Sequence, residues 1–197
     1  MISPSIDPAA ELSAAVLRYR QHGDLGALLD SLRDLAARTP ADDLPPLAKP
    51  YLDQPEVVIP IYERIVAARP ADAQALVVLA NAYWLTGRGP EVVGDLASRA
   101  IAADATNRGA WHLWALSESN VRARVDRWQQ IAERFPADLL ARAALADNAA
   151  SLAGAERDPR ALDLAIRTYE SLLAVTTDPG PRTAIDAALK TLRGWKL

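Results

Sequence analysis

The sequence contains no cysteine and only two histidines, and these shortages exclude several kinds of chemistry. Without cysteine there are no disulfides, thiolate metal sites or thiol nucleophiles. The histidines, His22 and His112, do not form a His-x-x-x-His spacing, and no Asp-x-Asp-x-Asp run supports a metal site. The glycine-containing turn at 87–90 lacks the Lys-Ser/Thr pair and the preceding strand of a phosphate-binding loop. We therefore predict no metal ion and no cofactor.

Catalytic patterns are equally scarce. His112 and Ser119 lie seven residues apart and could share a helix face, but no carboxylate or oxyanion turn accompanies them. A polar surface pair explains them better than a nucleophile and its base. The sequence therefore predicts a protein that is not an enzyme.

Lysine occurs only three times, so almost all positive charge is arginine, and the net charge is −3. This acidic balance disfavours nucleic acid as a partner. The cluster Arg122, Arg124 and Arg127 is interpreted as a solvated helix face, with contact to an acidic partner as the alternative. No segment approaches the ~20 apolar residues of a membrane span, so membrane insertion is not expected. Met1 to Asp7 show no basic patch followed by an apolar run, which favours a cytoplasmic location without an export signal.

A repeated tripeptide organises the chain. Pro-Ala-Asp occurs at 40–42, 70–72 and 136–138, and Ala-Thr-Asn at 105–107 takes the corresponding place. The last residues of these tripeptides are separated by 30, 35 and 31 residues, a spacing that suits a pair of short helices and two turns. Proline ends the preceding helix, and Asp or Asn then caps the next one by accepting a backbone N–H bond.

The segments between these tripeptides have helical periodicity. Leu76, Leu79, Ala80 and Tyr83 recur at i, i+3, i+4 and i+7, and period-two alternation of β-branched residues is missing. We predict an all-α superhelix, a single solenoid domain of about five helix pairs plus a C-terminal capping helix. The expected repeats are 9–42, 43–72, 73–107, 108–138 and 139–178, and the capping helix spans about 182–195.

Residues 73–107 resemble a tetratricopeptide repeat of a divergent bacterial type. Leu79 and Ala80 match the Leu-Gly/Ala pair of that family, Tyr83 matches its aromatic residue and Gly87 its turn glycine. Residues 9–42 also fit the frame without a gap. The range 43–72 is degenerate, because four prolines at 45, 46, 50 and 55 leave little room for a first helix. Pro60 is expected to kink or delay the second helix.

The resemblance implies a scaffold or adaptor whose concave groove, lined by the first helix of each pair, binds a peptide or helix of a partner protein. The positions that would face this groove are Gln74, Val77, Val78, Asn81, Trp84, His112, Leu113, Leu116, Ser119 and Asp147, together with Ser13, Leu17, Arg20 and Ala143 in other repeats. Packing between repeats is the alternative for the valines and leucines at 77, 78, 113 and 116. Trp111, Trp114 and Trp128 are interpreted as core anchors.

The same comparison indicates the character of the partner. Family members that clamp a terminal carboxylate place Asn where this chain has Asn81, with Lys or Arg on neighbouring first helices. Here those neighbouring positions hold Val77, His112 and Ala143. The basic clamp is therefore largely absent, and a partly apolar segment is the expected partner rather than an acidic tail.

Two alternative functions remain open. The stretch 73–138, with its Gly-Arg-Gly-Pro turn and its Trp-Gln-Gln run, is similar to repeat domains of bacterial cytochrome c maturation factors, which hold apocytochrome tails in the periplasm. Self-assembly into a homo-oligomer through an uncapped repeat face is the other alternative.

Overall fold

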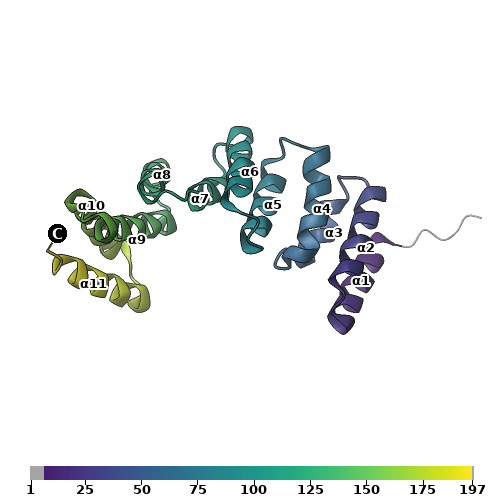
Figure 1. Cartoon of the computed structure of the whole chain (residues 1–197), viewed down its shortest axis with the longest axis horizontal. Helices are drawn as coiled ribbons and strands as arrows, with labels where there is room; N and C mark the ends of the chain where they lie inside the picture. Colours follow the sequence, from purple (N-terminus) through teal and green to yellow (C-terminus); the bar gives the residue numbers. More distant parts are fainter. Residues whose placement is uncertain (1–6, 197) are drawn as a thin grey trace, which may run out of the picture. The chain divides into compact units, whose positions relative to one another are not determined.

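The computed structural model describes residues 7–196, so the segment 1–6, which carries most of the N-terminus interpreted above as lacking an export signal, lies outside the described residues. Helices account for all regular secondary structure of the described chain, which contains no strand (Figure 1). The helices are α1 Pro8–His22, α2 Leu25–Arg38, α3 Leu44–Ala48, the 3₁₀ turn η1 Lys49–Tyr51, α4 Pro55–Ala68, α5 Ala73–Leu85, α6 Pro90–Ala103, α7 Arg108–Leu116, α8 Val121–Arg134, α9 Leu139–Glu156, α10 Pro159–Val175 and α11 Pro179–Arg193.

The chain forms two compact units, of which the first ends at Leu113 and the second begins at Trp114, within α7. In the N-terminal unit α1 packs on α2, α2 on α4, α4 on α5 and α5 on α6. In the C-terminal unit α8 packs on α9, α9 on α10 and α10 on α11. The predicted all-α architecture of helix pairs with a closing helix is confirmed, whereas a single solenoid domain stays a prediction.

Aspartate and asparagine begin several helices by capping them. Asp72 accepts a bond from the Ala75 N–H (3.0 Å), and Asn107 accepts one from the Ala110 N–H (3.2 Å). Asp42 is the exception, because it lies in a turn before α3 and pairs instead with Arg69, at 3.2 Å. The predicted cap is therefore wrong at this one of the four repeated tripeptides.

The predicted apolar stripe of α5 is buried. Leu76, Leu79, Ala80 and Tyr83 all lie in the core, where a fully buried leucine contributes about 1.5–3 kcal/mol. The prolines of residues 43–72 act in part as expected. The first helix of this repeat, α3, has only five residues, as the four prolines predict. Pro60 lies inside the second helix, α4, and neither delays nor ends it.

The tryptophans follow the core prediction only in part. Trp128 is buried, but Trp111 and Trp114 are half-buried. The indole N–H of Trp111 donates to the carbonyl of Ala105 (3.0 Å), and the guanidinium of Arg127 lies 4.4 Å from the centre of the Trp114 ring. Polar and cationic contacts therefore hold these two rings near the surface.

The arginine cluster on α8 is engaged within the C-terminal unit rather than free in solvent. Arg122 donates to Glu156 and to Asp158, the latter at 3.0 Å. Arg124 donates to the side chain of Asn148 (2.8 Å), and Arg127 pairs with Glu118 (2.7 Å). All three side chains thus bond to groups of their own unit, while Arg122 also stays exposed to solvent, as the interpretation of a solvated helix face expects.

Candidate functional site

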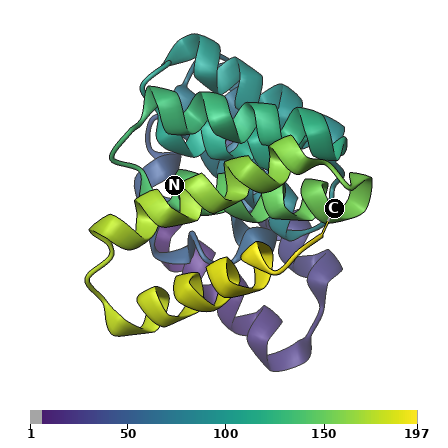
Figure 2. The same ribbon diagram turned by 90° about the vertical axis from the view of Figure 1, so that its left-hand side faces the viewer.

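The C-terminal unit contains an apolar cleft between α9, α10 and α11, which we call the α9–α11 cleft. Its volume is about 660 Å³, within the range typical of binding pockets. Figure 2 shows α10 and α11 as a hairpin joined by the turn after Val175. The cleft is lined by Leu139, Leu140, Ala143, Asp147, Tyr169, Leu172, Val175, Thr176, Thr177, Asp178, Pro181, Ala184, Ile185 and Ala188.

The cleft exists because α11 is anchored mainly through its C-terminal half. Leu189 and Leu192 are the buried residues of α11. Beyond the helix, the ring of Trp195 packs on α9, where a Cβ at Gly154 would lie 3.2 Å from its Cη2 atom. Before Leu189, α11 presents to the cleft only one large apolar side chain, that of Ile185, beside the small side chains of Ala184 and Ala188. These do not fill the space opposite the first turns of α9.

Large apolar side chains at the rim of the cleft remain in contact with water. Leu140 is 66% exposed, Val175 51% and Leu139 45%. Single exposed apolar residues are ordinary on protein surfaces, but a group of them beside an apolar cavity marks an interaction site. Covering this rim would release the water that now contacts it.

Two carboxylates supply the charge of the cleft. The hydroxyl of the buried Tyr169 donates to a carboxylate oxygen of Asp147. Burial, and to a smaller extent this hydrogen bond, raises the pKa of Tyr169 well above its ordinary value, so the phenol is neutral at physiological pH. Asp178 caps α11 by accepting a bond from the Gly180 N–H (3.0 Å). Each carboxylate is thus positioned by one hydrogen bond and remains exposed to solvent.

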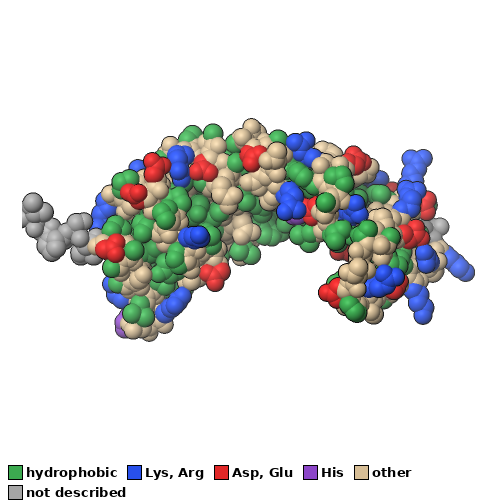
Figure 3. Space-filling view, turned by 180° about the vertical axis from the view of Figure 1, so that it is seen from behind, with side chains coloured by type: hydrophobic (Ala, Val, Ile, Leu, Met, Phe, Trp, Pro, Cys, Tyr) green, Lys and Arg blue, Asp and Glu red, His purple; other side chains and the backbone are tan. Residues whose placement is uncertain are grey.

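The predicted groove residues of α5 lie in the N-terminal unit. Gln74, Asn81 and Trp84 are at least partly exposed, and Val77 and Val78 are half-buried. Val77 packs close to the backbone of α7, since a Cβ at position 109 would lie 3.3 Å from its Cγ1 atom. Figure 3 shows one face of the molecule, on which hydrophobic side chains cover much of the N-terminal unit between scattered charges.

The remaining predicted residues are divided between the two units. His112 is half-buried and Leu113 is 5% exposed, so Leu113 follows the alternative interpretation as a packing residue. In the C-terminal unit Leu116 and Ser119 are exposed. Asp147 lines the α9–α11 cleft together with Ala143. One groove containing all ten residues stays a prediction.

In the first repeat, two of the expected groove residues connect structural elements instead. The Ser13 hydroxyl lies 3.1 Å from the Tyr51 hydroxyl, and Arg20 donates to the side chain of Gln54 (3.2 Å). Leu17 is exposed. The polar positions of α1 therefore hold the segment that follows α3.

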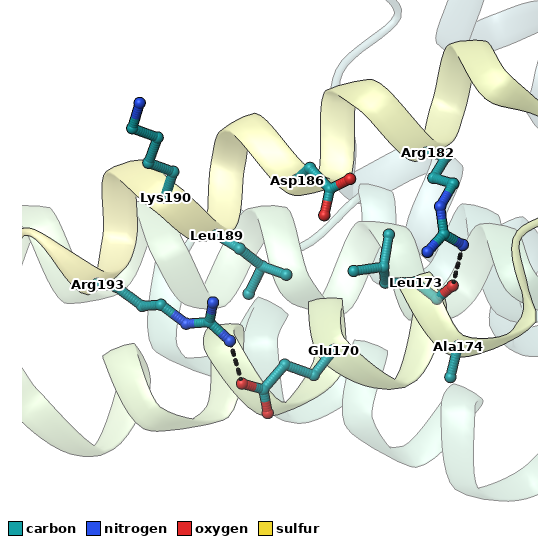
Figure 4. A pocket seen from close by; sticks show the side chains of 8 residues that line it. All are labelled: Glu170, Leu173, Ala174, Arg182, Asp186, Leu189, Lys190 and Arg193. Atoms are coloured by element: carbon teal, nitrogen blue, oxygen red, sulfur yellow. Dashed lines mark hydrogen bonds and ion pairs between the residues drawn. The ribbon is translucent and has the colours of Figure 1, made fainter.

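A second cavity, of about 490 Å³, lies between α10 and α11 (Figure 4). Arg193 pairs with Glu170 across it (2.7 Å), and Arg182 donates to the carbonyl of Leu173 (3.1 Å). Lys190 points away from the other labelled side chains. Three of the charged groups of this second cavity, those of Glu170, Arg182 and Arg193, are thus already engaged, so the α9–α11 cleft is the better candidate for binding.

Residues 7–196 contain no group of three or more His, Cys, Asp or Glu side chains arranged to hold a metal ion. Among the helices of the described chain, none has the length and apolarity needed to cross a membrane.

Sequence reasoning missed most of the cleft. Leu139, Leu140 and Val175 lie at helix ends, outside the i, i+3, i+4 stripes on which the groove prediction was based. One signal was available, since two adjacent leucines directly follow the Asp138 cap of α9, and adjacent residues of a helix do not share one face.

No protein-family model matches the chain, and no curated protein matches it in sequence. Solved structures do match in fold. A crystal structure of MamA has a TM-score of 0.58 at 18% identity, covering 78% of this chain and 91% of that chain. A second MamA structure has a TM-score of 0.59 at 15% identity, covering 87% and 97%. TTC0263, a thermophilic TPR protein of Thermus thermophilus, has a TM-score of 0.55 at 17% identity, covering 95% and 99%. The chain therefore has a tetratricopeptide-like helical repeat fold.

Proposed function

We propose that this protein is an interaction module without catalytic activity, which binds an apolar segment of a partner protein in the α9–α11 cleft. The observation that carries this proposal is the combination of a 660 Å³ apolar cavity with the exposed side chains of Leu139, Leu140 and Val175 at its rim. Burying apolar surface contributes about 25 cal/mol per Å², so an occupant that covers the cavity and the exposed side chains at its rim gains affinity without any covalent step.

The polar groups of the cleft support binding rather than catalysis. The hydroxyl of Tyr169 donates a hydrogen bond to Asp147, and the raised pKa of Tyr169 keeps the phenol protonated. Asp178 serves as a helix cap. A hydrolytic or transfer reaction would need an activated nucleophile beside a base. Of the hydroxyl groups in the lining, that of Tyr169 is held protonated and that of Thr176 donates to the carbonyl of Leu172 (2.8 Å).

The chain offers a matched pair of substitutions that tests the cleft. Leu139 and Leu25 are each the first residue of a helix, each follows an aspartate cap, and they are 45% and 44% exposed. Only Leu139 lines the cleft. Leu139→Gln and Leu25→Gln therefore introduce the same uncharged polar group at equivalent helix positions, one inside the proposed site and one outside it.

Both variants and the wild-type chain would be used to select from a library of random 12-residue peptides displayed on phage. We expect the wild type and Leu25→Gln to retain the same peptides and Leu139→Gln to lose them, with equal thermal stability in all three proteins. Peptides that bind Leu139→Gln as well as the wild type would place binding elsewhere and refute the proposal.

The exposed residues Asn81 and Trp84 of α5 are proposed as a second contact surface, in the N-terminal unit. Their side chains face solvent on a helix that is otherwise packed on α4 and α6. If Trp84→Ala retains every partner of the wild type, this surface takes no part in binding.

The two alternative functions have separate tests. Light scattering over a hundredfold range of protein concentration detects self-assembly. Titration with peptides from apocytochrome tails tests the cytochrome maturation alternative, which fails if none binds.

A further inference from the structure

We propose that the occupant of the α9–α11 cleft carries a lysine or arginine beside its apolar residues, and that Asp147 and Asp178 bind this positive charge. The inference rests on the proposed function, since it specifies what enters the same cleft. It concerns the chemistry of the partner, which the apolar lining alone does not determine.

The charge inside the cleft is negative. Among the fourteen lining residues, Asp147 and Asp178 carry the only ionisable charges at neutral pH, and no lysine, arginine or histidine accompanies them. Apolar walls lower the local dielectric and strengthen the field of charges placed between them. An occupant with a carboxylate would be repelled, whereas one with an ammonium or guanidinium group would be attracted.

The arginines next to the cleft do not neutralise these two carboxylates. Arg182 follows the cleft residue Pro181, but its guanidinium donates to the carbonyls of Leu173 (3.1 Å) and Thr176 (3.2 Å). Arg142, next to Ala143 on α9, donates to the carbonyl of Pro136. The hydrogen bond from Tyr169 leaves the charge of Asp147 in place, because a neutral phenol donates it.

The helix ends around the cleft do not reverse this preference. Both α9 and α11 begin here, and a helix N-terminus attracts anions. Each of these ends already holds an aspartate, Asp138 on α9 and Asp178 on α11. The helix α10 ends at the same place, with Val175 in the lining, and a helix C-terminus favours cations.

The chain allows the charge to be removed without removing the hydrogen bonds. Asparagine caps helices about as well as aspartate, so Asp178→Asn keeps the start of α11. In Asp147→Asn the amide oxygen still accepts the bond from Tyr169. The double variant therefore removes both negative charges of the cleft with its shape retained, and equal thermal stability of the two proteins verifies this.

The experiment selects from the same 12-residue phage library with the full-length wild-type chain and with the Asp147→Asn/Asp178→Asn variant. Only peptides that Leu139→Gln, which leaves the charge of the cleft unchanged, fails to retain are counted as cleft binders. In the wild-type selection we expect Lys and Arg to exceed Asp and Glu next to the apolar residues, and this excess to disappear in the double variant. The affinity of a selected peptide should fall roughly three- to tenfold in the double variant, as expected for two partly exposed ion pairs.

A synthetic peptide in which glutamine replaces the basic residue provides the decisive control. It should bind the wild type and the double variant equally, and its affinity should change little between low and high salt. If cleft binders lack the basic excess, or if the basic peptide binds both proteins equally, the inference is overturned while the proposed function stands. If no peptide depends on Leu139, the proposed function and the inference both fail.

Discussion

Replacing Asp138 by alanine tests how firmly α9, the central helix of the cleft, is anchored at its start. The Asp138 side chain accepts hydrogen bonds from the backbone N–H groups of Leu140 and Ala141, both at 3.1 Å. Asp138 is 6% exposed and Ala141 is fully buried. Alanine leaves these two donors without that acceptor, and water has poor access to the one on Ala141.

The magnitude follows from this geometry. Loss of an N-cap costs about 0.5–2 kcal/mol, and an unsatisfied buried donor costs about 1–3 kcal/mol. We therefore expect Asp138→Ala to lower the free energy of unfolding by about 2 kcal/mol. Asp24 provides the matched control, because it caps α2 with one bond to the Ala27 N–H (2.9 Å) but is exposed. There water replaces the lost acceptor, and the expected cost is about 0.5–1 kcal/mol.

Urea denaturation followed by tryptophan fluorescence measures both costs, with the buried Trp128 as a reporter in the C-terminal unit and Trp84 and Trp111 as reporters in the N-terminal unit. Asp138→Asn should stay close to the wild type, because asparagine caps equally well. An equal loss in the Asp24 and Asp138 alanine variants would show that burial of the cap has no effect. A loss in Asp138→Asn as large as that in Asp138→Ala would show that charge rather than capping is responsible.

Three further predictions concern other parts of the chain. Trp195→Ala removes the ring packed on Gly154 and should speed amide hydrogen exchange in residues 186–196, with exchange in α1–α6 unchanged. Unchanged exchange in 186–196 would show that the ring does not anchor α11. Burial and the hydrogen bond to Glu63 raise the pKa of Tyr83 to about 12, above its ordinary value near 10. The protonated phenol stabilises the fold fully below about pH 10, and this stabilisation should be lost as the pH rises to about 12. The midpoint of urea denaturation should therefore fall between these pH values, and a midpoint that does not change with pH would contradict the prediction. Leu76→Ala, at a fully buried position, should cost about 2–5 kcal/mol in the same urea assay, and a cost below about 1 kcal/mol would place the side chain outside the core.

The sequence was sufficient for the fold because its signals are local. Proline after a helix and Asp or Asn before the next one mark boundaries wherever they stand, as Asp72 and Asn107 show. The stripe of α5 predicted its buried face because helical periodicity determines which side chains share a side. Asp42 failed as a cap because the next helix starts elsewhere, a choice that the prolines after it determine together with packing.

The site was predictable only in part because it depends on an angle between helices. Ala143 and Asp147 were expected to face a groove because the resemblance implies this for their positions in the repeat, and both line the cleft. No pattern indicated that α11 would meet α9 through Trp195 and leave a space opposite the first turns of α9. Leu140 and Val175 acquire their role from this space, and neither shows it in its local sequence.

The most direct test of the central claim is hydrogen–deuterium exchange of the full chain with and without a selected cleft-binding peptide. Occupancy of the α9–α11 cleft predicts slower exchange in 139–147 and 175–188, with 74–84 unchanged. Protection confined to 74–84, or no protection in either half of the cleft at a saturating concentration of peptide, would contradict the account.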